Sequence, residues 1–117
     1  MPAPATSKES VMNAVALRFY VHQPRRHGKD LLFEWLLERA KAMGIHGGSA
    51  FFAAAGYGRD GVIHEQRFFE LPETLPVMVE FIVPAEEADK MLDLVRAEKI
   101  HCFATRTPTE AIVIDGQ

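Results

Sequence analysis

The sequence predicts an α+β domain in which two helices cover one face of an antiparallel sheet. Two stretches alternate apolar and polar residues strictly, which is typical of half-buried strands. Two further stretches carry apolar residues at helical spacing. The elements follow one another as β-α-β-β-α-β with an extra short strand at the C-terminal end. This is the order of the ferredoxin-like sandwich, also called the split β-α-β arrangement.

The first half of the chain supplies a strand, a helix and a second strand. Ala14–His22 alternates apolar and polar side chains and is rich in β-branched and aromatic residues, which favours a strand. Asp30 is a suitable N-cap for the following helix. Gly44 is placed to end that helix in the left-handed conformation. The small apolar segment Ser49–Ala54 is the next expected strand.

The second half repeats the pattern after a long link. Val77–Val83 is the clearest strand, and Pro84 both stops it and suits the first turn of a helix. Apolar residues at i, i+3, i+4 and i+7 continue that helix. We expect a strand at His101–Arg106 and a short last strand at Ala111–Asp115.

Composition indicates one folded domain, residues 14–117, after a flexible tail, residues 1–13. The formal net charge of −3 argues against a nucleic-acid partner. No apolar run approaches the ~20 residues of a membrane-spanning helix, so we expect no membrane insertion. The first ten residues lack the apolar core of a secretory signal. Cys102 is the single cysteine, which fits a cytoplasmic protein.

The alternation assigns side chains to the two faces of the sheet. One set should lie under the helices: Val15, Leu17, Phe19, Val77, Val79 and Phe81. The other set should lie on the uncovered face, and it is too apolar for simple exposure to water. In this fold the first and third strands are neighbours, so Arg18 and Glu80 could pair there. We interpret this face as an oligomer interface formed by Arg18, Tyr20, Met78, Glu80 and Ile82.

A series of motifs in fixed order resembles a known family, the uncharacterised bacterial domain of unknown function 190. This family belongs to the PII-like superfamily, named after the nitrogen regulatory protein PII. The resemblance extends over about residues 14–114. The motifs are "LRFYV" (Leu17–Val21), "HGKDLLFEWLLERAKAMGIHGG" (His27–Gly48), "GYG" (Gly56–Gly58), His64 and "LPVMVEFIV" (Leu75–Val83).

The resemblance implies a homotrimer whose sheets face inward. It also implies a role for the long link, residues 53–76, which sits where PII proteins carry the T-loop. That loop contacts partner proteins, and its base helps to form nucleotide sites between subunits. The family commonly has an Arg-Gly pair before its glycine–aromatic–glycine, whereas this chain has Phe52 and Ala53 there. The missing arginine removes one candidate contact to an anion.

Three groups of residues are candidates for a ligand site. Arg26 and Lys29 belong to a basic cluster just before the first helix, where a helix N-terminus adds donors that suit an anion. The glycines of "GYG" permit a ligand to approach the backbone closely. His64 lies further along the link. The candidate ligand-binding set is Arg26, Lys29, Gly56, Tyr57, Gly58 and His64.

Catalytic and metal motifs are not evident in the sequence. The five histidines show no paired spacing, so we predict no metal site. His101 and Cys102 are adjacent on an expected strand and should point to opposite faces, which argues against a nucleophile pair. We find no Ser–His–Asp pattern and no phosphate-binding loop, so we predict no catalytic residues and expect a protein that is not an enzyme.

Three functions from different classes remain open at this point. The leading one is a PII-like sensor that binds a small anionic metabolite, for which an adenine nucleotide is the candidate, and acts on a partner protein through residues 53–76. The second is a trimeric metal-binding protein of the CutA type, which shares the PII-like fold. The third is a small dimeric α+β barrel enzyme, which uses the same order of elements and binds its ligand between sheet and helices.

Overall fold

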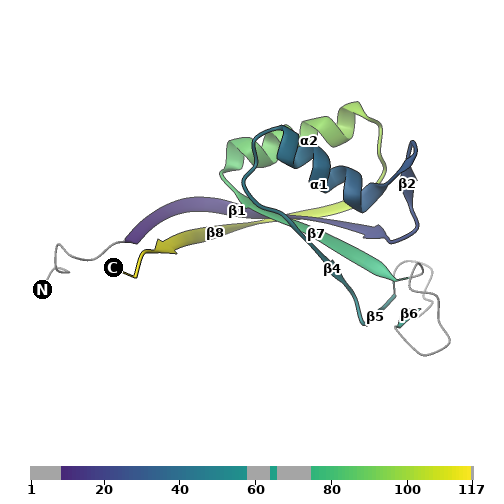
Figure 1. Cartoon of the computed structure of the whole chain (residues 1–117), viewed down its shortest axis with the longest axis horizontal. Coiled ribbons are helices and arrows are strands. Elements are labelled where there is room, and N and C mark those ends of the chain that lie inside the picture. Colours follow the sequence, from purple (N-terminus) through teal and green to yellow (C-terminus); the bar gives the residue numbers. More distant parts are fainter. Residues whose placement is uncertain (1–8, 58–63, 66–74, 117) are drawn as a thin grey trace, which may run out of the picture.

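The computed structural model of the chain describes residues 9–57, 64–65 and 75–116. Two helices pack on one side of a sheet, and a ribbon of two strands projects from the domain at one end (Figure 1). The elements in chain order are β1 (Glu9–His22), β2 (Arg26–His27), β3 (Asp30–Leu31), α1 (Leu32–Ala42), β4 (Ser49–Phe52), β5 (Ala55–Gly56), β6 (His64–Glu65), β7 (Pro76–Val83), α2 (Ala85–Ala97) and β8 (Phe103–Ile114).

The main sheet has four strands in the order β4-β7-β1-β8, and all neighbours are antiparallel. The two strands with the clearest alternation, β1 and β7, occupy its centre. Both helices cover the same face (Figure 1). The predicted ferredoxin-like α+β architecture is therefore confirmed.

The core lies between this covered face and the helices. All six side chains that were expected under the helices are buried, and Leu17, Phe19, Val77 and Val79 have no exposed surface. The rings of Phe19 and Phe81 meet edge to face, with centroids 6.3 Å apart. The helices contribute the facing apolar residues, which are Leu32, Leu36, Ala40, Ala88, Met91 and Val95.

The boundaries of the first helix are partly as predicted. Gly44 follows the helix with φ +88°, which confirms its left-handed conformation. The predicted N-cap, Asp30, is wrong: the cap is Leu31, and no side chain caps the helix. Asp30 instead pairs with His27 in the small β2–β3 ladder. The hairpin imposes an extended backbone up to Leu31, so the helix begins one residue later.

The last strand differs from the prediction of two separate strands. A single strand, β8, runs from Phe103 to Ile114 and includes Pro108. The separate short strand expected at Ala111–Asp115 is part of it. Proline is tolerated because β8 lies at the edge of the sheet, where half of the N–H groups have no strand partner.

The first strand begins earlier than the prediction. Residues 9–13 were expected in the flexible tail, but they form the start of β1 and pair with residues 110–114 of β8. The alternation is hard to recognise there because the segment mixes Glu9, Ser10 and Asn13 with apolar residues. The long partner strand supplies the hydrogen bonds that the local sequence does not announce.

The close contact at Gly48 generates a stability prediction. A Cβ at this position would lie 2.7 Å from Phe81 Cδ1 and 3.1 Å from Leu37 Cδ2. We expect Gly48→Ala to lower the free energy of unfolding by about 1–3 kcal/mol because the buried Phe81 ring must shift. Urea denaturation at a fixed protein concentration measures it.

Gly47→Ala is the matched control, since a Cβ at the preceding residue would meet no atom within 4 Å. The two variants should differ clearly in their midpoints. Equal midpoints would show that the core around Phe81 accommodates the methyl group without cost.

Candidate functional site

The basic cluster before α1 is a tight hairpin formed by β2 and β3. Gly28 occupies its turn with φ +63°. The Arg26 guanidinium donates from Nη1 to the carbonyl oxygen of Lys29 at 2.9 Å, which fixes the turn. Arg26 and Lys29 are exposed. The structure thus brings these two predicted site residues together, with the Arg26 side chain closing the hairpin and the Lys29 side chain exposed to solvent.

His27 connects this hairpin to the end of the second helix. Its Nε2 lies 2.8 Å from Glu98 Oε1, just after α2. Its ring also packs edge to face on Trp35 of α1, with centroids 4.7 Å apart. The hairpin is therefore held against both helices, so the backbone around Lys29 has a defined position.

A second group of predicted site residues lies where the long link starts. Gly56 of β5 is paired with His64 of β6, so the link closes into a small ladder at its base. A Cβ at Gly56 would lie 3.3 Å from Pro76 Cγ, so the backbone passes close to the start of β7. Tyr57 is 72% exposed. Gly58 lies outside the described residues.

The structure brings the candidates together in two groups rather than one. Lys29 and Arg26 share a hairpin, and Gly56 and His64 share a ladder. Both groups lie toward the end of the sheet opposite the projecting ribbon (Figure 1). Within the described ranges, no hydrogen bond or ion pair joins the groups in one subunit.

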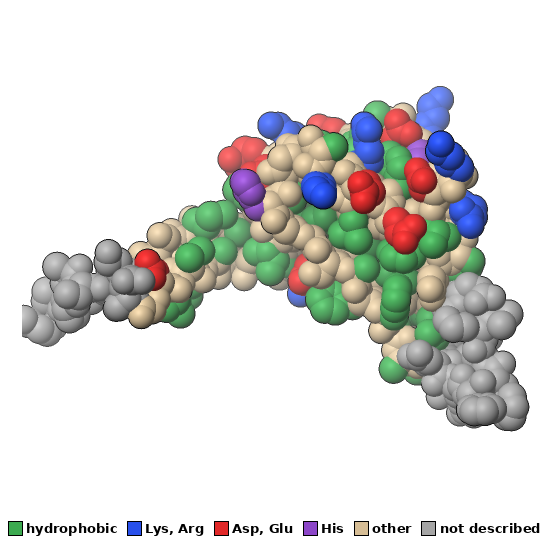
Figure 2. All heavy atoms as spheres, in the orientation of Figure 1, with side chains coloured by type: hydrophobic (Ala, Val, Ile, Leu, Met, Phe, Trp, Pro, Cys, Tyr) green, Lys and Arg blue, Asp and Glu red, His purple; other side chains and the backbone are tan. Residues whose placement is uncertain are grey.

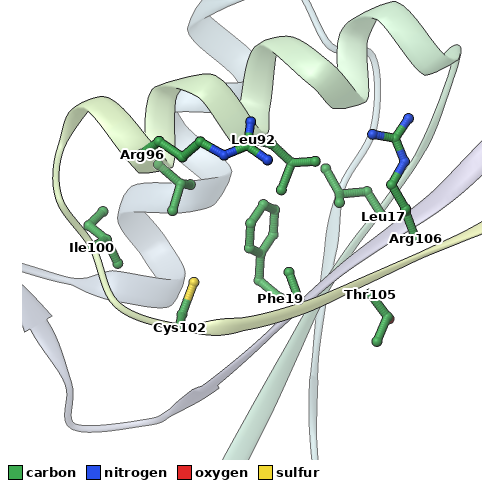
Figure 3. Close-up of a pocket in the computed structure, with 10 residues that line it drawn as sticks. Leu17, Phe19, Leu92, Arg96, Ile100, Cys102, Thr105 and Arg106 are labelled. Carbon is green, nitrogen blue, oxygen red and sulfur yellow. The ribbon is translucent and has the colours of Figure 1, made fainter.

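A hollow of about 370 Å³ lies between α2 and β8 (Figure 3). Its lining is mainly apolar and includes Phe19, Leu92 and Ile100, and two arginines, Arg96 and Arg106, contribute to it. Each arginine already faces a carboxylate of α2: Arg96 Nη1 lies 2.9 Å from Asp93 and Arg106 Nη1 lies 2.7 Å from Asp89. Sequence reasoning missed this hollow because it depends on contacts between a helix and a strand that no local pattern shows.

Cys102 also lines this hollow. Burial raises the pKa of its thiol, and the nearby charge of Arg25 offsets this only in part. A raised pKa keeps the sulfur protonated at neutral pH, and a thiol is a poor nucleophile. The geometry therefore agrees with the interpretation that Cys102 is a structural residue.

The uncovered face of the sheet presents its side chains in rows across the four strands. One row is apolar, with Phe51, Met78, Tyr20 and Phe103 opposite one another in register. The rings of Tyr20 and Phe103 lie 5.6 Å apart. Phe51 and Phe103 are about half or more exposed. The face expected to be an interface is thus an apolar surface open to solvent in one subunit.

The adjacent row contains the predicted ion pair. Arg18 and Glu80 are cross-strand neighbours, and Arg18 Nε donates to Glu80 Oε2 at 2.7 Å. The side chains are 37% and 18% exposed, respectively. The hydrogen bond to Glu80 raises the pKa of Arg18 further above its usual value, so this arginine stays charged. All five residues of the predicted interface occupy this face: Arg18, Tyr20, Met78, Glu80 and Ile82.

The described residues show no group of three or more His, Cys, Asp or Glu side chains that could hold a metal ion. No helix in the described part of the chain is long and apolar enough to span a membrane. The space between sheet and helices, where an α+β barrel enzyme would place its ligand, holds the fully buried Phe19, Phe81 and Met91.

Solved structures with the same arrangement define the class of fold. A PII-like signalling protein of Thermus thermophilus superposes with a TM-score of 0.60 at 18% identity, over 89% of this chain and 92% of that one. CPII of Thiomonas intermedia K12, a nitrogen regulatory PII-like protein bound to ADP, AMP and bicarbonate, gives a TM-score of 0.60 at 16% identity, over 91% and 92%. The domain therefore has the PII-like fold.

The sequence relationship is more specific. The UPF0166 protein of Aquifex aeolicus (strain VF5) is 32% identical over 88 residues, which cover 75% of this chain and 84% of that protein. The model of the family DUF190, described as "Uncharacterized ACR", matches residues 14–111. The chain belongs to this family, as its motifs indicated.

The buried thiol generates a prediction about reactivity. Because burial raises the pKa of Cys102, its alkylation by iodoacetamide at pH 8 should be at least severalfold slower in the folded protein than in urea. The rate in the folded protein should still rise with pH above 9, since the thiolate forms later than in the unfolded chain. Mass spectrometry of the alkylated protein gives both rates, and equal rates in the two states would contradict the assignment.

Proposed function

We propose that this protein is a PII-like sensor rather than an enzyme. In this proposal three copies assemble with their sheets facing inward and bind a small anionic metabolite in the clefts between them. The bound ligand changes the position of residues 53–76, which contact a partner protein. The observation that carries the proposal is the closed base of this link, where Gly56 and His64 pair beside the start of β7.

The separation of the candidate residues into two groups supports a site between subunits. The hairpin presents an exposed lysine on a rigid backbone, and the base of the link presents glycine backbone and the exposed Tyr57 ring. A cationic side chain and an aromatic ring suit a phosphate and a base, respectively. We propose that the hairpin of one copy and the link of a neighbour form one site from Arg26, Lys29, Gly56, Tyr57, Gly58 and His64.

An adenine nucleotide is the ligand that we propose first. CPII, which has the same fold, was crystallised with ADP, AMP and bicarbonate. The present chain carries Phe52 and Ala53 where the family resemblance leads us to expect Arg-Gly. Lys29 would then supply the main contact to phosphate, so the affinity should depend on this residue more than on any other.

Binding of ATP, ADP, AMP and cyclic AMP should be measured by calorimetry. We expect saturable binding of at least one of them, and we expect Lys29→Gln to weaken it by about tenfold or more because a charge-assisted contact is lost. Lys90→Gln is the matched control, since Lys90 is an exposed lysine on α2 away from both groups. No binding of any of the four would overturn the nucleotide assignment, and equal loss in both variants would remove Lys29 from the site.

The proposed inward-facing sheet is tested through its ion pair. Within an interface, Arg18 and Glu80 would lose solvent, and reversing one charge would leave two like charges 2.7 Å apart or force them to separate. We expect Arg18→Glu and Glu80→Arg each to reduce the trimer fraction in native mass spectrometry by at least tenfold. The double exchange Arg18→Glu/Glu80→Arg should recover part of it.

The corresponding exchange of the exposed pair Asp93 and Arg96 on α2 is the control. Its side chains are 75% and 70% exposed, so reversal should leave the assembly unchanged. If the single Arg18 and Glu80 variants assemble like the wild type, the uncovered face is not the interface.

A further inference from the structure

The ribbon that projects from the domain consists of residues 9–13 of β1 and residues 110–114 of β8, and we refer to it as the arm (Figure 1). β7 pairs with β1 only from Val15 onward, so the arm has no third strand. Neither helix reaches it (Figure 1). An isolated ribbon of two strands is at best marginally stable in water. The arm therefore needs a cover that one copy of the chain does not provide.

Both faces of the arm are apolar. Val11 and Ile112 are directly opposite in register and share one face, and Met12 and Val113 lie on the other. Together with Ile114, these five side chains are between 43% and 70% exposed. Figure 2 shows hydrophobic side chains along the projecting part of the molecule.

The arm also lacks the features that protect free strand edges. Exposed edges in soluble monomers are usually interrupted by lysine, proline or a bulge. The arm contains no lysine, arginine or proline, and its charged residues are Glu9 and Glu110. The ladder from Glu9 to Tyr20 pairs continuously with β8, without a bulge. A regular, apolar, unprotected ribbon is the pattern of a buried contact.

We propose that a second copy of this chain covers the arm, so that the arm clasps a neighbouring subunit. This inference rests on the assembly in the proposed function and adds a second contact to it. The same two strands lead from the arm directly into the uncovered face, so the two surfaces are continuous. Arm and face together offer apolar area on the order of the ~800 Å² that each partner contributes to a standard interface.

The test replaces the paired apolar residues and keeps the strand. Val11→Thr/Ile112→Thr removes the apolar contact, and threonine retains high β-propensity. We expect the concentration at which the assembly dissociates, measured by size-exclusion chromatography, to rise at least tenfold. The control Asn13→Thr/Glu110→Thr changes the adjacent polar pair of the same ladder and should leave it unchanged. Dissociation at the wild-type concentration in the first variant would overturn the proposal.

Hydrogen–deuterium exchange of the wild type supplies a readout that needs no variant. Amides of residues 9–13 and 110–114 should exchange as slowly as those of residues 15–21 if a second copy covers the arm. Exchange within seconds would show a free arm and overturn the proposal. The arm fails if these two measurements fail while the nucleotides still bind, whereas the sensor assignment fails if no nucleotide binds, whatever the arm does.

Discussion

The pairing of β1 with β7 is the constraint on which the rest of the structure depends. Side chains alternate between the faces of a strand, so a shift by one residue would exchange the buried and the open sets. The buried set gains its free energy under the helices, led by Phe19 and Phe81. On the other face the same register places Arg18 opposite Glu80, with their side chains hydrogen bonded at 2.7 Å. A shifted register would therefore bury charges and expose the core.

This register also determines what the molecule can do. Because the helices use only one face, the opposite face of four strands stays open. It carries an aromatic row, a charged row and the continuation into the arm, and none of these is covered within one subunit. The geometry is that of a building block whose functional surfaces arise between copies. The basic hairpin and the base of the link fit this view, since they lie in separate groups in one subunit.

The sequence predicted the features that depend on local pattern. Strict alternation identified β1 and β7, and topology then paired Arg18 with Glu80 correctly. The sequence did not predict features that depend on a distant partner. The arm was missed because residues 9–13 become a strand only by pairing with 110–114, beyond Pro108. The hollow containing Cys102 was missed because it forms between α2 and β8. Lys29 and Gly56 were correctly placed near turns, but their role as a site stays a prediction.

The assembly of three copies is the central claim, because the proposed ligand site and the covered arm both depend on it. Sedimentation equilibrium of the wild-type protein at micromolar concentration tests it most directly. A mass three times that of the 13.1 kDa chain would agree with sheets that face inward and arms that are covered. A monomer of 13.1 kDa would contradict it, because the aromatic row and the arm would then face water.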